Sequence, residues 1–210
     1  QAAANSKLAR ASGSAPHLVF WEPPGSDAAP AGIDPTRDKR TMPEGALEAT
    51  ANFYVAAIKV MADYGYPADY LEITNEPDGD WNIMIPPVRY LKLLQLVRSV
   101  AKQQSIKLPS LSGPGTSSIT SLLNYIRNDD IAKQLLENLD VVSVHVWDDR
   151  IHRDTIAVAR QAAQRLAGLG YTREIVASEF AVTFLDPADR AAGRGAFQRS
   201  PESVSGHPAY

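Results

Sequence analysis

Short apolar segments alternate with longer amphipathic segments along most of this chain, and this alternation limits the possible folds more than any other feature of the sequence. Each apolar run has the length of a buried strand. The intervening segments all exceed the dozen or so residues that a parallel crossover needs, so the alternation predicts a parallel α/β sheet. The expected strands are His17–Trp21, Tyr70–Thr74, Leu108–Ser112, Val141–Val146 and Glu174–Ser178.

Several segments between these strands carry apolar residues every three or four positions, which is typical of amphipathic helices. The clearest one covers Glu44–Tyr64 and ends before Gly65. The other expected helices are Pro86–Gln104, Ser118–Arg127, Ile131–Leu136 and Asp154–Leu169, with a helical tail at Gln1–Ala11. We interpret Ser112–Gly115 as a turn, because glycine and proline are concentrated there.

A doubly wound sheet and a (β/α)8 TIM barrel both satisfy this order of elements. A dinucleotide-binding doubly wound sheet would carry G-x-G-x-x-G after its first strand, and no such sequence follows any expected strand. The barrel is therefore favoured. Because an eight-stranded barrel typically needs about 250 residues, we expect residues 1–210 to be one incomplete barrel domain holding strands three to seven and lacking the first two strands and the last.

The composition narrows the classes of partner. The chain has 44% hydrophobic residues and a net charge of −3, which indicates a globular domain with a sizeable core. It has no basic stripe that could neutralise phosphates, and no run of about 20 apolar residues that could span a bilayer. We therefore expect neither nucleic acid nor membrane as a partner. The absence of cysteine excludes disulfides and thiolate metal sites, and leaves the compartment open.

Functional groups of a barrel come from the carboxyl ends of its strands. Glu76 and Glu179 provide carboxylates at such positions on two different expected strands. Cleavage of a glycosidic bond needs one carboxyl group to protonate the leaving oxygen and another to attack the sugar or to activate water. The composition of the strand ends therefore indicates a carbohydrate site. The other residues at or beside strand ends are Trp21, Glu22, Asn75, His145 and Trp147.

The segments LEITNEP and EIVASEF resemble the strand-four and strand-seven signatures of clan A glycoside hydrolases, and the resemblance covers about Pro16–Leu185. Within the clan, the chain is most similar to family 30 or a neighbour such as 39 or 5. The resemblance implies a retaining glycosidase that cleaves β-linked glycans by double displacement without a cofactor. It assigns Glu76 as the general acid/base and Glu179 as the nucleophile, and it favours a secreted or periplasmic location.

The same resemblance implies a set of residues that bind an oligosaccharide or polysaccharide substrate. Asn75 would hydrogen-bond the sugar 2-hydroxyl, and His145 would face the nucleophile. The tryptophans are expected to stack on sugar faces. The full set is Asn75, His145, Trp147, Trp21, Trp81 and Glu22. We expect no metal, because the run from Asp78 to Asn82 matches only the first positions of a calcium loop.

Two other functions fit parts of this pattern. A non-catalytic carbohydrate-binding protein on a degenerate glycosidase barrel would have the same fold, since fold does not determine function. The presence of both glutamates argues against it. A barrel enzyme for phosphorylated metabolites would need a glycine-rich phosphate loop after strand seven, and Phe180–Leu185 does not supply one. Neither the sugar, the linkage nor the choice between endo and exo action follows from the sequence.

Overall fold

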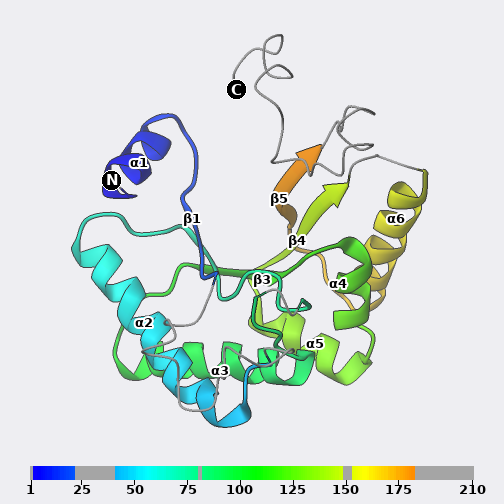
Figure 1. Ribbon diagram of the computed structural model, residues 1–210, viewed down its shortest axis with the longest axis horizontal. Helices are drawn as coiled ribbons and strands as arrows, with labels where there is room; N and C mark the ends of the chain where they lie inside the picture. The colour runs from blue at the N-terminus through cyan, green and yellow to red at the C-terminus, as the bar shows by residue number, and fades with distance from the viewer. Residues whose placement is uncertain (1, 22–40, 80–81, 149–152, 183–210) are drawn as a thin grey trace, which may run out of the picture.

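In the part of the chain that the structure describes, five parallel strands form one curled sheet in the order β1-β2-β3-β4-β5 (Figure 1). The computed structural model describes residues 2–21, 41–79, 82–148 and 153–182. The strands are β1 (His17–Val19), β2 (Tyr70–Glu72), β3 (Ser110–Thr116), β4 (Val141–Asp148) and β5 (Ile175–Val182). The helices are α1 (Ala2–Ala11), the 3-10 turn η1 (Glu44–Ala46), α2 (Leu47–Asp63), α3 (Pro87–Gln103), α4 (Ile119–Tyr125), α5 (Asp129–Asn138) and α6 (Arg153–Gly168).

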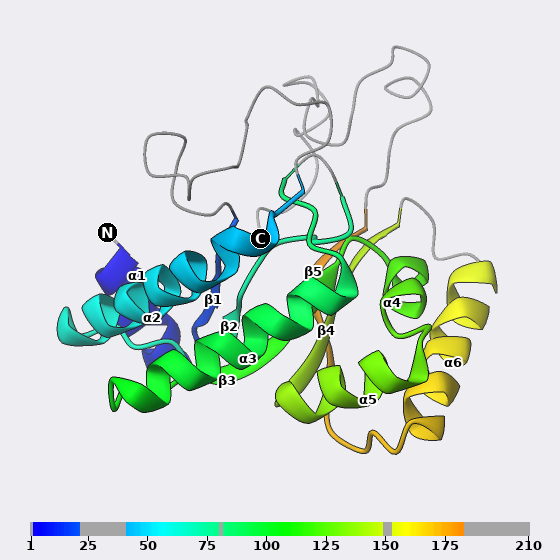
Figure 2. The same ribbon diagram turned by 90° about the horizontal axis from the view of Figure 1, so that it is seen from below.

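The strand order equals the order along the chain, so each crossover returns to the adjacent strand. Helices α2, α3 and α5 lie side by side against the outer face of the sheet, and α4 packs on α6 beside β4 (Figure 2). A curled parallel sheet with its helices outside agrees with part of a (β/α)8 barrel. The prediction of a parallel α/β fold is therefore confirmed, and closure into a full barrel stays a prediction.

Alternation along the strands separates an apolar outer face from a polar inner face. Successive side chains of a strand point to opposite faces. In β4, Val142 and Val144 join the helix-side core, whereas Ser143 and His145, also fully buried, lie on the other face. In β2, Leu71 joins the same core and Glu72 lies on the inner face. The inner face is therefore lined by groups that can hydrogen-bond, and it leads to the carboxyl edge of the sheet.

The main difference from the sequence prediction is in β3. We expected a strand to end at Ser112 and a turn to follow, but β3 runs from Ser110 to Thr116 through Gly113, Pro114 and Gly115. The glycines are there because neighbours approach the backbone closely: a Cβ on Gly113 would lie 3.1 Å from a Leu139 methyl group and closer still to the Tyr90 hydroxyl. The small residues make room for side chains from other elements, a requirement that local sequence does not reveal.

Side-chain caps begin the two short helices that follow β3. Ser118 accepts a hydrogen bond from the Ser121 amide at 3.1 Å, and Asn128 accepts one from the Ile131 amide at 3.0 Å. Replacing Ser118 by alanine leaves that amide without its partner, so we expect the free energy of unfolding to fall by about 1 kcal/mol. Urea denaturation measures the loss, and Ser118→Asp, which keeps a capping oxygen, should recover most of it. An unchanged midpoint for Ser118→Ala would contradict the capping role.

Among the residues that the structure describes, no helix combines the length and apolar character needed to cross a membrane.

Candidate functional site

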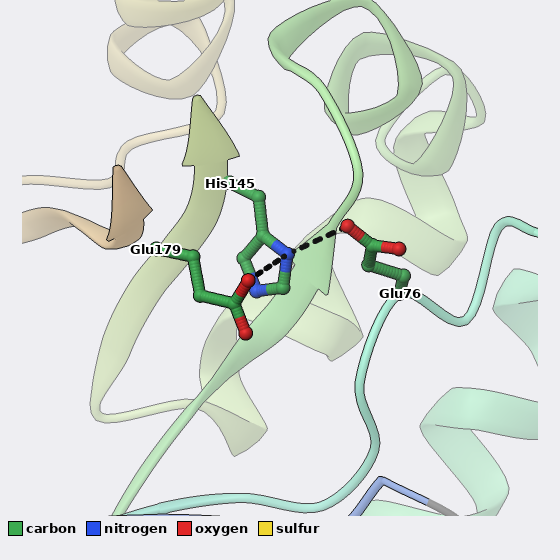
Figure 3. A group of neighbouring side chains, drawn as sticks. All are labelled: Glu76, His145 and Glu179. Atoms are coloured by element: carbon green, nitrogen blue, oxygen red, sulfur yellow. Dashed lines mark hydrogen bonds and ion pairs between the residues drawn. The ribbon is translucent and has the colours of Figure 1, made fainter. Parts of the chain in front are cut away.

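Glu76, His145 and Glu179 meet at the carboxyl edge of the sheet (Figure 3). Glu76 follows β2, whereas His145 and Glu179 belong to β4 and β5 and are direct partners in the register of these strands. Figure 3 shows the imidazole of His145 between the two carboxylates. The chain therefore brings together three of the residues predicted from the strand ends, although Glu76 and His145 are 69 positions apart in sequence.

The distances within this cluster are short. Nδ1 of His145 lies 2.9 Å from Oε1 of Glu76 and 3.7 Å from Oε2 of Glu179. One ring nitrogen of His145, one oxygen of Glu76 and one oxygen of Glu179 all lie within 4.8 Å of one another. The histidine side chain is fully buried, while the side chains of Glu76 and Glu179 keep 14% and 22% exposure. Both carboxylates can therefore be reached from solvent, and the imidazole lies beneath them.

An irregularity between β4 and β5 aims Glu179 at this cluster. Val144 pairs with Ala177 and His145 with Glu179, so Ser178 is an extra residue on β5. In a regular strand, two successive side chains would point to opposite faces. Here the hydroxyl of Ser178 and the carboxylate of Glu179 both contact groups of the inner face. Bulges of this kind redirect side chains, and they occur often beside active sites.

The backbone around Glu76 is held in an uncommon conformation. Its φ angle is 45°, in the left-handed region that non-glycine residues rarely adopt. Its amide donates to the carbonyl of Gly115 at 3.1 Å. Two residues later, the carboxylate of Asp78 accepts hydrogen bonds from the amide and hydroxyl of Ser117, at 2.8 and 2.5 Å. These contacts attach the loop after β2 to the end of β3, and such strain persists at functional sites where the surroundings support it.

The environment of His145 favours its protonated form. Burial by itself lowers the pKa of the imidazole, but hydrogen bonds to Glu72 and Glu76 and the charges of Glu72 and Glu179 outweigh burial and raise the pKa to about 9. An opposite charge at a distance of a few ångströms stabilises the charged form of a titratable group. The cluster therefore retains a proton on or beside His145 at neutral pH.

Asn75 immediately precedes Glu76 and is 1% exposed. Its side-chain oxygen has no hydrogen-bond partner among the residues that the structure describes. A buried amide oxygen without a partner costs free energy, so a ligand hydroxyl that donates to it would be favoured. This observation supports the substrate-binding role predicted for Asn75.

The structure gives less information on the other predicted binding residues, which are Trp21, Trp147, Glu22 and Trp81. Trp21 lies two residues beyond β1 with 59% of its surface exposed. Trp147 belongs to β4, where its backbone pairs with Ala181, but its side chain lies outside the described residues, as do Glu22 and Trp81. Sugar stacking by the tryptophans stays a prediction.

Sequence reasoning missed three residues of the inner face: Glu72, Ser143 and Ser178. The carboxylate of Glu72 lies 3.4 Å from Nε2 of His145 and accepts hydrogen bonds from both serine hydroxyls. One signal was available, because Ser143 and His145 alternate with valines in VVSVHV and Glu72 stands between Leu71 and Ile73. Polar residues at alternate positions of an apolar strand indicate a polar inner face.

The geometry of Glu76, His145 and Glu179 is also close enough for the three side chains to surround a cation. Carboxylate and imidazole groups are common ligands of divalent metals. The expectation that the protein needs no metal therefore stays a prediction.

A separate groove of about 680 Å³ lies at the opposite end of the sheet, where its lining includes Leu18, Tyr70 and Ser110. Tyr70 and Ser110 begin their strands. Active sites of (β/α)8 barrels lie at the carboxyl ends of the strands, so the Glu76 cluster, and not this groove, is the candidate functional site.

No protein-family profile matches the sequence, and no curated protein matches it. Solved structures do share its fold. A conserved exported protein from Bacteroides fragilis aligns with a TM-score of 0.68 and 13% identity, over 86% of this chain and 42% of that chain. A GH30 endoxylanase from Clostridium papyrosolvens aligns with a TM-score of 0.54 and 18% identity, over 87% of this chain and 52% of that chain.

The catalytic domain of GH30 xylanase C from Talaromyces cellulolyticus has a TM-score of 0.51 at 18% identity, over 67% of this chain and 34% of that domain. At such identities the likeness establishes the fold alone. The chain spans about half the length of the first two structures, 42% and 52%. Its neighbours thus include clan A glycoside hydrolases, the superfamily that its motifs resemble, while membership of family 30, 39 or 5 stays a prediction.

Proposed function

We propose that this protein is a retaining glycoside hydrolase that cleaves β-linked glycans, with Glu179 as nucleophile and Glu76 as general acid/base. The observation that carries the proposal is the meeting of two partly exposed carboxylates, each with an oxygen within 4.8 Å of the other, at the carboxyl edge of a parallel sheet. Retaining enzymes separate their carboxyl groups by about 5–5.5 Å, whereas inverting enzymes need about 6.5–9.5 Å to admit a water molecule. Oxygens of Glu76 and Glu179 that approach within 4.8 Å leave little room for such a water molecule, which favours retention.

In the first step, an oxygen of Glu179 attacks the anomeric carbon while the glycosidic bond breaks, and Glu76 donates its proton to the leaving oxygen. In the second step, Glu76 takes a proton from water, and the resulting hydroxide displaces Glu179 and frees the sugar. Asn75, whose buried side-chain oxygen has no partner among the described residues, would accept a hydrogen bond from the 2-hydroxyl of the sugar. Because two of the structural neighbours are GH30 xylanases, xylan is the first substrate to test.

Hydrolysis followed by proton NMR tests both the activity and the stereochemistry. The full protein is incubated with xylan, with soluble β-glucans and with β-mannans, and the anomeric signals of the products are recorded before mutarotation. We expect new reducing ends whose first signal is the β-anomer. An initial α-anomer would show inversion and exclude Glu179 as nucleophile. Binding of oligosaccharides without any hydrolysis would instead identify a carbohydrate-binding protein on a degenerate barrel.

A further inference from the structure

Glu72 is a fully buried carboxylate that the proposed reaction does not use directly. It lies at the end of β2, on the inner face of the sheet, and its side chain has 0% exposure. Burial of a charge is costly unless other groups compensate for it. The presence of Glu72 in this position therefore requires an explanation in terms of its partners.

Both oxygens of Glu72 face polar groups from other strands. Oε2 accepts hydrogen bonds from the hydroxyls of Ser143 at 2.5 Å and Ser178 at 3.0 Å. Oε1 lies 3.4 Å from Nε2 of His145. The backbone of Gly115 passes so close to this carboxyl group that no side chain would fit between them. Two hydroxyl donors and one ring nitrogen thus surround the carboxyl group, so both of its oxygens have a polar partner.

The contacts of Glu72 determine which nitrogen of His145 carries a hydrogen. Oε2 already accepts hydrogen bonds from two hydroxyls, and a carboxylate oxygen is an acceptor, so Nε2 is the donor toward Oε1. Nδ1 then faces Glu76 at 2.9 Å. With a neutral imidazole, Nδ1 accepts a hydrogen bond from a protonated Glu76. In the imidazolium, Nδ1 donates to an ionised Glu76. Both arrangements contain the same number of protons.

We propose that Glu72 is a positioning residue: held in place by the hydroxyls of Ser143 and Ser178, it keeps a hydrogen on Nε2 of His145 and directs Nδ1 to share a single proton with Glu76. The catalytic meaning of this arrangement rests on the proposed function. The shared proton passes from the pair to the leaving oxygen in the first step, and a proton from water restores it in the second. Glu72 itself gains and loses nothing.

Other titratable groups near this chain of contacts leave the assignment intact. Glu179 approaches Nδ1 from β5 at 3.7 Å and adds negative charge. On β1, burial lowers the pKa of His17, against the charge of Glu72 and together with that of His145, so His17 is neutral at physiological pH. Burial and the charge of Glu72 raise the pKa of Tyr90 on α3 well above its usual range, so Tyr90 is neutral as well. Of these groups in the described part of the chain, His145 is therefore the cationic one that faces Glu72.

Nitrogen-15 NMR of the histidine side chains tests the proposal in the absence of any substrate. The chain has only four histidines, so the signals of His145 can be assigned as those missing from the spectrum of His145→Gln. In the unsubstituted protein we expect both ring nitrogens to be protonated until the pH approaches about 9, the raised pKa of His145. Above that midpoint, which belongs to the coupled pair with Glu76, the neutral ring should carry its hydrogen on Nε2.

Glu72→Gln removes the charge with little change of shape. The titration midpoint of the His145 imidazole should then fall by about 1–3 pH units, because an opposite charge within a few ångströms is lost. Glu72→Asp keeps the charge and should restore a large part of the midpoint. Ser112→Ala is the matched control: Ser112 lies beside Glu72 in the register of β2 and β3 and is equally buried, yet its hydroxyl has no partner among the described residues. This control should leave the midpoint unchanged.

An unchanged midpoint in Glu72→Gln would overturn the proposal, and so would a neutral His145 that carries its hydrogen on Nδ1. The second result needs only the unsubstituted protein, so it decides even if Glu72→Gln does not fold. The titration is also independent of hydrolysis. If the protein is inactive but His145 titrates as expected, the positioning role of Glu72 stands and the proposed glycosidase activity is wrong. If the protein is active but His145 titrates with the pKa of a free histidine, the activity stands and the positioning role is wrong. In an active protein, the alkaline limb of kcat/KM should move with the NMR midpoint.

Discussion

Replacement of Glu76 by glutamine is expected to lower kcat on an unactivated β-glycan by about 10²–10⁴-fold, the usual contribution of a general acid. The amide keeps the shape of the side chain but has no acidic proton for the leaving oxygen. An aryl glycoside with a good leaving group does not need this proton, so its first step should be affected much less. Stopped-flow measurement of aryl release should then show a burst, because the glycosyl-enzyme accumulates when no base activates water.

Glu179→Gln should remove turnover on both kinds of substrate, since without the carboxylate there is no nucleophile for either. The contrast between the two variants separates an acid/base from a nucleophile. Glu137→Gln, on the exposed surface of α5, is the matched control and should keep the parent activity. Measurable turnover of a natural glycan by Glu179→Gln would exclude Glu179 as nucleophile. An equal loss for Glu76→Gln on natural and activated substrates would argue against its role as the acid.

Gly115→Ala is expected to lower the free energy of unfolding by about 2–5 kcal/mol. Gly115 has a φ of +61°, and an L-residue in the left-handed conformation costs about 1–2 kcal/mol. A Cβ at this position would also lie 2.8 Å from Oε2 of Glu72 and closer still to Oε1 and the carboxyl carbon. Overpacking of a close-packed interior adds about 1–3 kcal/mol, so the two effects together exceed those of an ordinary surface substitution.

Gly65→Ala provides the control for this prediction. Gly65 has a similar backbone, with a φ of +83°, but a Cβ there would have no atom of the described residues within 4 Å. Only the conformational cost of about 1–2 kcal/mol should remain. Urea denaturation of the two variants therefore isolates the close approach between Gly115 and Glu72. Equal losses of stability in both variants would show that the packing against Glu72 contributes nothing.

The order of elements follows well from local patterns. Helix α2 and helix α3 lie within two or three residues of their predicted bounds, because an amphipathic helix depends on spacing along one short segment. The strands β1 and β2 are shorter than expected, and β3 continues through Gly113-Pro114-Gly115, where the sequence predicted a turn. The prediction was wrong because it took these glycines as signs of a flexible turn. In the structure they lack a side chain where Tyr90 and Glu72 approach the backbone closely.

By itself, the sequence determined the alternation of strands and helices, the parallel sheet and the position of Glu76 just beyond a strand, since each depends on neighbouring residues. Glu179, expected directly after a strand that ends at Ser178, lies inside β5 (Ile175–Val182) instead. Only the tertiary structure decided the bulge that turns Ser178 and Glu179 toward the same face, and the contacts that join Glu72 to Ser143 and Ser178. These contacts connect residues 71 and 106 positions apart. Register and approach between such distant segments arise from packing of the whole sheet, so no local pattern encodes them.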